Sequence, residues 1–216
     1  MDLQVIQSYI PLYIEATKLT VSIGTIGILL SIVIGLVCSV IQYYRIPVLK
    51  QITSAYIEVS RNTPLLVQLF FIYYGLPRIG IPMDPRLSGI IGLAFLGGSY
   101  MAESFRSGLE AVTTTQRETA MSLGMNRPQT IFYIIFPQAF VISFSSFMAN
   151  IIFLMKETSV FSAIGLLDLM FTAKDLIGMH YSTDEALFLL VVFYLIILLP
   201  LSVLGRIIEG RLRTWI

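Results

Sequence analysis

Charged residues are scarce in this sequence, since Asp, Glu, Lys and Arg together make up 12% of its 216 residues. In a soluble domain about a quarter of the residues are charged, so a surface that faces water on all sides is excluded. Hydrophobic residues make up 56%, and the mean hydropathy is +0.83. The net charge of +1 gives no reason to expect a nucleic-acid partner. We therefore predict an integral membrane protein with one domain spanning residues 1–216.

Residues that carry chemistry are also few. Cys38 is the single cysteine and His180 the single histidine, so an internal disulfide and a Cys/His metal cluster are both excluded. The sequence contains neither H-E-x-x-H nor the phosphate-cradling pattern G-x-x-x-x-G-K-[ST]. We therefore expect no catalytic residue, no metal site and no cofactor in this chain. Charges at Asp2, Glu15 and Lys18 precede the first apolar run, which is unlike a cleavable signal peptide.

Long uncharged runs are what the sequence has in abundance. A membrane-spanning helix needs ~20 mostly apolar residues. The third of the apolar runs must continue through Glu103 and Arg106 to reach that length. We predict an all-α membrane fold whose five transmembrane helices contain residues 19–44, 62–77, 87–102, 128–155 and 186–205.

The distribution of basic residues predicts an orientation, because Lys and Arg concentrate on the cytoplasmic side. With the N-terminus outside, nine of the 14 basic residues fall on the inner side: Arg45, Lys50, Arg61, Arg106, Arg117, Arg127, Arg206, Arg211 and Arg213. This orientation places residues 116–124 and the C-terminus in the cytoplasm. It places residues 159–185 outside.

The stretch "TQRETAMSLGMNRP" is polar and favours a helix over residues 115–125. Thr115 and Glu118 have the spacing of a capping box. Gly124 can adopt the left-handed conformation that ends a helix, and Asn126 with Pro128 then begins the next span. A helix of about two turns is too short to be stable alone in water. Either it lies on the membrane surface as an ordinary loop helix, or a cytoplasmic partner holds it.

Five residues of this region stand at the spacing of the EAA loop: Glu118, Ala120, Gly124, Ile134 and Pro137. The pattern resembles the signature of permease subunits of bacterial ABC importers, with mild departures at Thr119 and Phe136. The resemblance implies a coupling helix that docks into a cleft on a separate ATPase subunit, which would bind ATP and Mg²⁺. The residues expected to couple the two subunits are Arg117, Glu118, Ala120, Leu123 and Gly124.

Three further stretches narrow the resemblance: "YIEVSRNTPLLVQLFFIYYGLP", "GGSYMAESFRSG" and "NIIFLMKETSVFSAIG". They are similar to the polar-amino-acid permeases of histidine, glutamine and arginine uptake systems, where the usual forms read RGTP, EIFRGG and KDTSL. The resemblance runs from about residue 20 to residue 213 and implies the type I permease fold in a bacterial cytoplasmic (inner) membrane. It also implies an external or periplasmic amino-acid-binding protein, docking at residues 159–185 and the "PRIGIPMDPR" loop. A second permease subunit, identical or a close paralogue, would complete the pathway.

Ionisable residues at membrane depth usually mark a pathway or a pair. Four polar residues share one face of the third predicted span: Ser99, Glu103, Arg106 and Glu110. That face lines a cavity, or its Glu103–Arg106 pair holds helices together; the two interpretations can coexist. At the end of the fourth span, Asn150 and Glu157 share a face and Thr158 flanks it. The alternative there is a helix end that simply enters water.

The segment "SRNTPLL" predicts a broken helix. The residue before a proline disfavours helix, and Thr63 before Pro64 fits an N-cap with proline at the first helical position. Asn62 stands where the family usually has glycine. A helix broken at membrane depth exposes N–H groups that suit a carboxylate. The alternative is a plain interfacial start to the second span.

We hypothesise that these elements line one pocket for an amino acid, with the substrate-binding residues Asn62, Thr63, Ser99, Glu103, Arg106, Asn150, Glu157 and Thr158. Glu103 and Glu157 would bind an ammonium or guanidinium group, and the break near Asn62, or Arg106, would bind the carboxylate. Because two acidic residues, Glu103 and Glu157, are set against one basic residue, Arg106, a basic substrate such as arginine, lysine or histidine is favoured. The alternatives of another class are a stand-alone ion-coupled carrier or channel, and a membrane scaffold without transport activity.

Overall fold

The computed structural model describes residues 2–212 and 214, and in this part of the chain every regular element is a helix. Four helices are long: α1 (Leu3–Tyr43), α4 (Pro85–Ala111), α7 (Phe136–Glu157) and α9 (Thr183–Leu212). Five are shorter: α2 (Leu49–Arg61), α3 (Leu65–Phe70), α5 (Thr114–Ser122), α6 (Arg127–Thr130) and α8 (Leu169–His180). Short stretches of π- or 3₁₀-helix continue some of these helices. Phe71–Gly75 and Leu76–Ile79 follow α3, Ile131–Ile135 joins α6 to α7, and Thr158–Ile164 follows α7.

Three helical stretches of the described chain are both long and apolar enough to cross a membrane: Leu3–Tyr43, Arg127–Ile164 and Thr183–Leu212. The segment Leu65–Ile79 is apolar but shorter, and α4 has 27 residues. The all-helical membrane fold is therefore confirmed, while the number of five spans stays a prediction. The first helix begins at Leu3 rather than near residue 19. Glu15 and Lys18 form an exposed ion pair within the helix, so their charges do not mark its start.

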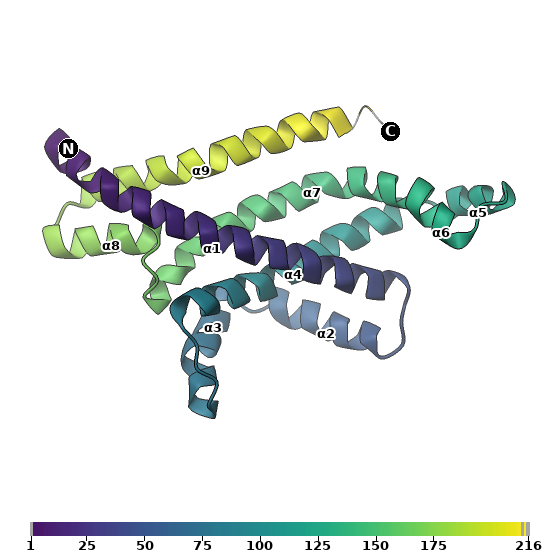
Figure 1. The fold of residues 1–216 in the computed structure, drawn as a ribbon, viewed down its shortest axis with the longest axis horizontal. Coiled ribbons are helices and arrows are strands. Elements are labelled where there is room, and N and C mark those ends of the chain that lie inside the picture. The colour runs from purple at the N-terminus through teal and green to yellow at the C-terminus, as the bar shows by residue number, and fades with distance from the viewer. Residues whose placement is uncertain (1, 213, 215–216) are drawn as a thin grey trace.

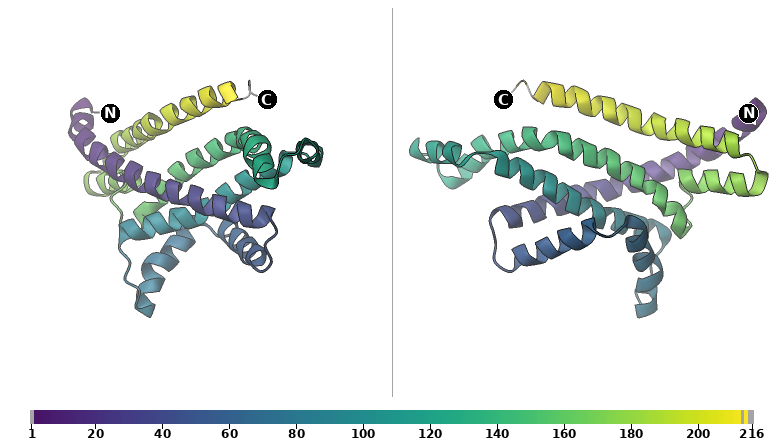
Figure 2. Two further views of the ribbon diagram at one scale, coloured as in Figure 1. Left: turned by 45° about the vertical axis from the view of Figure 1, so that its right-hand side comes forward. Right: turned by 180° about the vertical axis from the view of Figure 1, so that it is seen from behind.

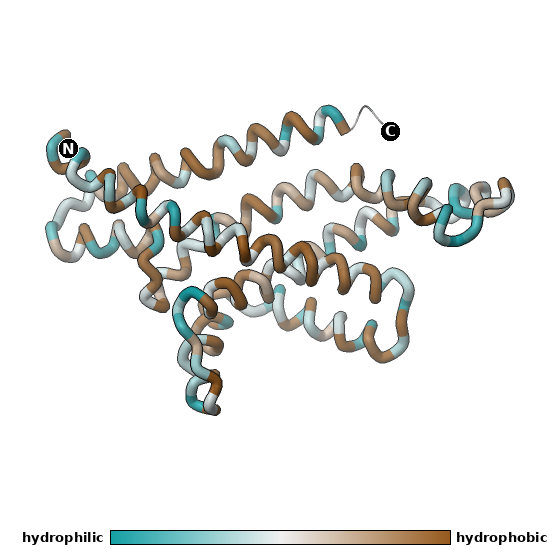
Figure 3. The backbone as a smooth tube through the Cα atoms, in the orientation of Figure 1, coloured by the Kyte–Doolittle hydropathy of each residue, from teal (hydrophilic) through white to brown (hydrophobic). Residues whose placement is uncertain are grey.

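The long helices run roughly along one axis, so that the two ends of the molecule differ (Figures 1 and 2). The N-terminus and α8 lie at one end. The α1–α2 connection, α5 and the C-terminal end of α9 lie at the other, and hydrophilic residues gather at α5 and α6 (Figure 3). Leu3 and Leu212, the outer bounds of α1 and α9, thus lie at opposite ends of the molecule, while the placement of the termini on opposite sides of a membrane stays a prediction. The assignment of the α5 end to the cytoplasm stays a prediction, and Arg213 of the basic group lies outside the described residues.

Helices α1 and α4 pack with their backbones in contact, because small residues line both surfaces. A Cβ atom added at Gly35 would lie 2.4 Å from the Cβ atom of Met101 and 2.8 Å from the backbone nitrogen of Ala102. Ser31 donates a hydrogen bond from Oγ to the carbonyl oxygen of Leu93 across the same contact, at 3.2 Å. Close approach through small residues is the usual basis of helix association in membranes. This pair forms a fixed support for the other helices.

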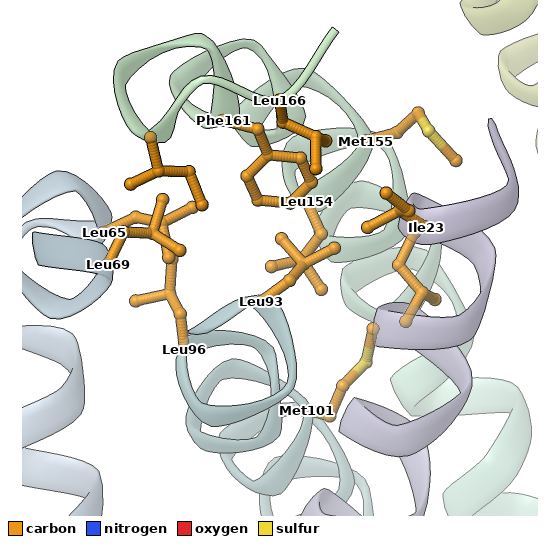
Figure 4. Close-up of a cluster of buried hydrophobic side chains, with 12 residues drawn as sticks. Ile23, Leu65, Leu69, Leu93, Leu96, Met101, Leu154, Met155, Phe161 and Leu166 are labelled. Atoms are coloured by element: carbon orange, nitrogen blue, oxygen red, sulfur yellow. The ribbon is translucent and has the colours of Figure 1, made fainter. Parts of the chain in front are cut away.

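The main hydrophobic core lies where α3, the N-terminal half of α4 and the end of α7 meet. Leu69, Leu93 and Leu154 are fully buried there, and Figure 4 shows them converging with Phe161 from the turn that follows α7. This core fixes α3 relative to α4 and α7. The pocket described below lies beside it.

Asp168 precedes α8, outside the spanning helices, and is fully buried. Its Oδ1 caps the helix by accepting a hydrogen bond from the backbone N–H of Phe171 at 2.9 Å. Burial raises the pKa of Asp168 to about 7, against the lowering effect of these N–H groups and of Lys174. The unfolded chain has an Asp pKa of about 3.9. Because the folded protein holds this proton more tightly, its stability falls as pH rises from about 4 to about 7.

Candidate functional site

The predicted helix break is present between α2 and α3. Helix α2 ends at Arg61, and α3 begins at Leu65 after Pro64, whose ψ of 143° is extended. The prediction that Thr63 caps α3 with Pro64 in its first turn is wrong. The hydroxyl of Thr63 donates a hydrogen bond back to the carbonyl oxygen of Val59, at 2.8 Å. Thr63 therefore closes α2 instead of opening α3, because its side chain satisfies a carbonyl left free at the end of α2.

Gln68 holds this break in place, which the sequence did not indicate. Its amide Nε2 reaches back to the carbonyl oxygens of Ser60, at 3.0 Å, and Thr63, at 2.9 Å. The side chain is buried, and satisfying two carbonyls there avoids the cost of leaving them unpaired in an apolar setting. A glutamine eight residues after a serine has no local signature, since the pairing depends on the fold of the break.

A pocket of about 370 Å³ opens at the break. Arg61 and Glu157 bring opposite charges to its wall, and the rings of Tyr100 and Phe153, 5.2 Å apart, form an aromatic side. Residues of α2, α3, α4, α7 and the following turn line it: Arg61, Asn62, Thr63, Pro64, Leu65, Leu66, Leu96, Tyr100, Phe153, Glu157 and Val160. The structure thus brings together three of the predicted residues, Asn62, Thr63 and Glu157. Arg61, previously assigned only to a basic group, joins them.

Arg61 has two neighbours beside the pocket. Its Nη1 lies 3.6 Å from Oε2 of Glu103, and its guanidinium lies over the ring of Tyr100, 5.3 Å from the ring centre. About 40% of the Arg61 side chain and 34% of the Glu103 side chain are exposed. The distance to Glu103 is that of a loose ion pair, and the cation–π contact orients the guanidinium plane.

The predicted Glu103–Arg106 pair is present and extends along α4. Arg106 contacts Glu103 through Nη2 and donates from Nη1 to both carboxylate oxygens of Glu110, at 3.0 Å and 2.8 Å. These three residues form a ladder at i, i+3 and i+7 on one helix face. None of them is among the lining residues of the pocket. Arg106 already has two carboxylates, so it is not a free receptor for a substrate carboxylate.

Three other predicted binding residues lie in helix contacts instead of the pocket wall. Ser99 is fully buried, with its Oγ 3.0 Å from Oγ of Ser60 on α2. Asn150 donates to Oγ of Ser104 on α4 at 2.7 Å. Thr158 is fully buried and bonds the preceding turn of its own helix. Buried polar groups need such partners, which Ser99 and Asn150 find on a neighbouring helix and Thr158 within its own helix.

At the opposite end of α4, the N-cap of the short helix α5 lies two residues earlier than predicted. Thr113 is its N-cap, with Oγ1 accepting from the backbone N–H of Gln116 at 3.4 Å, so the capping box at Thr115 and Glu118 is wrong. The start is fixed by Val112, which is buried in a small cluster with residues of the following helix. The predicted stop is confirmed, since Gly124 follows the helix with φ of +85°.

A capping box does occur, but one helix later. Oδ1 of Asn126 accepts from the backbone N–H of Gln129 at 3.0 Å, and the Gln129 side chain accepts from the N–H of Asn126 at 2.9 Å. Pro128 lies in the first turn of α6. The predicted start of this span at Asn126 and Pro128 is therefore confirmed.

The five predicted coupling residues differ in exposure. Leu123 is 79% exposed despite being apolar, and Glu118 is exposed. The guanidinium of Arg117 lies over the ring of Tyr43 at 5.8 Å, which ties α5 to the end of α1. Ala120 is buried within the chain, so it positions the helix and leaves the outer surface to its neighbours. The result is a short helix held on one side, with apolar and charged side chains presented on the other.

A helical membrane bundle with a charged pocket at a broken helix, and a short helix presented at one end, is the arrangement expected of a solute-translocating permease. The family description "Binding-protein-dependent transport system inner membrane component" matches residues 11–214, and the chain belongs to that family. The predicted family is thereby confirmed. The chain is a permease subunit of the amino-acid ABC-transporter class, and in such permeases the ATPase resides in a separate subunit.

Relatives cover nearly the whole chain. The chain is 32% identical over 214 residues to the Glutamine transport system permease protein GlnP of Escherichia coli (strain K12), covering 98% of each. It is 30% identical to the L-cystine transport system permease protein TcyL of Bacillus subtilis (strain 168), covering 98% of this chain and 92% of TcyL. A crystal structure of "an amino acid ABC transporter with histidines" superimposes with a TM-score of 0.90 at 32% identity, covering 98% and 99% of the two chains.

A more distant structure shares the fold. The inward-facing MetNI methionine ABC transporter superimposes with a TM-score of 0.80 at 18% identity, and covers 98% of this chain. The expected type I permease architecture is therefore shared with solved importers.

Proposed function

We propose that this chain is the membrane subunit of an ATP-driven importer of a polar α-amino acid. The observation that carries the proposal is the pocket at the α2–α3 break, which presents Arg61 and Glu157 on a wall that otherwise consists of two aromatic rings, aliphatic side chains and the residues of the break. An α-amino acid carries one ammonium and one carboxylate group. A pocket with one carboxylate and one guanidinium is complementary to both, and irregular backbone at membrane depth is tolerated where it lines such a cavity.

Glu157 binds the ammonium group in this proposal. It lies at the end of α7 on the pocket wall, across from the break that contains Asn62 and Thr63. The hydroxyl of Thr63 is already bonded to Val59, and the side-chain amide of Asn62 to Glu58. These two residues therefore shape the pocket and keep acceptor oxygens for the substrate.

The structure weakens the argument for a basic substrate. That argument counted two acidic residues, Glu103 and Glu157, and one basic residue in the pocket. Glu103 lies outside the pocket lining and is paired with Arg106 and Arg61. With Glu157 alone, the charges of the pocket balance those of a zwitterion. Relatives named for glutamine and cystine agree with a polar amino acid as the substrate.

Coupling to ATP hydrolysis occurs at α5 in this proposal. The helix presents Leu123 and Glu118 outward and is anchored through Ala120 and Arg117. A partner ATPase pair, carrying ATP and Mg²⁺, docks there on the cytoplasmic side. A second permease subunit completes the pathway, and a binding protein delivers the amino acid at the end that contains α8, where residues 159–185 lie.

The test is uptake by the complete transporter in proteoliposomes, with the cognate ATPase subunit and binding protein. A panel of amino acids is supplied with and without internal ATP. We expect ATP-dependent uptake of one or a few polar amino acids, and Glu157→Gln should raise their KM about tenfold or more, because it removes a charged hydrogen-bond partner. The matched control is Glu110→Gln, an exposed carboxylate of α4 outside the pocket. Uptake driven by an ion gradient without ATP would instead establish the carrier alternative.

A further inference from the structure

Arg61 is the one arginine of the pocket lining. Its ion pair with Glu103 is weak. The Nη1–Oε2 distance to Glu103 is 3.6 Å, whereas Arg106 contacts Glu103 directly and holds Glu110 through two hydrogen bonds of 3.0 Å and 2.8 Å. Glu103 thus has one firm partner and one loose partner. If the Arg61 side chain moved away, the carboxylate of Glu103 would still be paired with Arg106.

The surroundings of Arg61 favour such a change of partner. Its side chain is about 40% exposed and borders the pocket, so a carboxylate inside the pocket can reach it without displacing packed residues. The ring of Tyr100 supports the guanidinium at 5.3 Å from the ring centre and also lines the pocket. Guanidinium presents planar pairs of N–H donors that match both oxygens of a carboxylate. A bidentate bond of this kind is stronger than the loose pair that it replaces.

We propose that Arg61 alternates between two carboxylates: that of Glu103 when the pocket is empty, and the α-carboxylate of the amino acid when it is filled. This inference rests on the proposed function and assigns the carboxylate-binding residue of that same pocket. Glu103 acts as a competitor that holds the guanidinium in place in the empty state. It keeps Arg106 as its partner when Arg61 moves to the substrate.

The arrangement makes an unusual prediction about sign. If Glu103 were a ligand for the substrate ammonium, its neutralisation would weaken binding. If it competes for Arg61, its neutralisation frees the guanidinium and strengthens binding. The two roles of one carboxylate are therefore distinguished by the direction of a single affinity change.

The experiment measures binding of radiolabelled L-glutamine, L-arginine and L-histidine to the complete transporter in lipid nanodiscs, with competition by the corresponding α-carboxamides. In the wild type, replacing the carboxylate with a carboxamide should weaken binding about tenfold or more. Arg61→Gln should weaken binding of the amino acid by a similar factor and leave the affinity for the carboxamide within about threefold. Glu103→Gln should strengthen binding of the amino acid and leave the carboxamide unchanged. Arg206→Gln, an exposed arginine of α9 outside the pocket, is the matched control and should change neither.

Two outcomes would overturn the proposal. Equal losses of amino acid and carboxamide in Arg61→Gln would mean that the arginine only maintains the structure. Weaker binding of the amino acid in Glu103→Gln would mean that Glu103 is a ligand and not a competitor. A wild-type transporter that binds none of a full panel of amino acids would instead refute the proposed function itself.

Discussion

Replacing Gly124 with valine separates coupling from folding. The residue lies directly after α5 with φ of +85°, where a residue with a Cβ atom costs about 1–2 kcal/mol. A Cβ atom added there would meet no atom of the surrounding residues within 4 Å, so the cost comes from the local backbone conformation and not from contact with the rest of the protein. If the chain instead leaves the left-handed region, it loses the hydrogen bonds from the N–H groups of Gly124 and Met125 to the last turn of α5. Either way the closed helix end becomes about 5–30-fold less favoured.

The assay is ATP hydrolysis stimulated by the amino-acid-loaded binding protein, in the reconstituted complex. We expect Gly124→Val to reduce the stimulated rate severalfold, while the Tm of the solubilised permease changes little, because α5 buries only Ala120. Gly124→Asn should retain most of the stimulation, since asparagine tolerates the left-handed region. Gly210→Val, at a helical glycine of α9 in open space, is the control for the added side chain. Wild-type stimulation in Gly124→Val, or equal damage from valine and asparagine, would refute the reasoning.

Three further changes test the framework around these sites. Gly35→Ala should lower the Tm, by overpacking of about 1–3 kcal/mol against Met101, whereas Gly210→Ala, in open space within α9, should leave it equal or higher. Asp168→Asn should keep the α8 cap but flatten the fall in Tm expected of the wild type between about pH 4 and pH 7; parallel pH curves would contradict a raised pKa. Leu123→Ser should leave the Tm unchanged and reduce co-purification of the ATPase subunit, and undiminished co-purification would remove this exposed leucine from the docking surface.

Local signals in the sequence were sufficient where one residue type has one physical role. The glycine that ends α5 and the proline that breaks the second span were both predicted correctly, because positive φ and a missing N–H leave few alternatives. The start of α5 was predicted incorrectly, because Thr113, Thr114 and Thr115 are equally good helix N-caps in isolation. Burial of Val112 decided among them, and that contact comes from the following helix.

The candidate site shows a related limit. Helical spacing placed Ser99, Glu103 and Arg106 correctly on one face of α4, but spacing does not say what that face meets. The hydroxyl of Ser99 is hydrogen-bonded to that of Ser60 on α2. The carboxylate of Glu103 forms a loose ion pair with Arg61, the last residue of α2. Helix α2 is amphipathic and short, and it lies between two predicted spans, so its position against α4 could not be derived from apolar runs. Arg61 was consequently assigned only to the inner basic group, although it lines the pocket.

Pairing explains how charge can remain inside an apolar bundle without a substrate. An isolated ion at membrane depth is costly, yet the pocket must keep groups that an amino acid can bind. Arg61, Glu103, Arg106 and Glu110 together carry two positive and two negative charges, so this group of four is neutral when the pocket is empty. Because Arg61 is the terminal member with the longest contact, it is the charge that can change partner while Arg106 keeps its contacts with Glu103 and Glu110; the three residues left behind then carry a net charge of −1. A substrate carboxylate then enters a site whose complementary charge was stabilised in advance by Glu103.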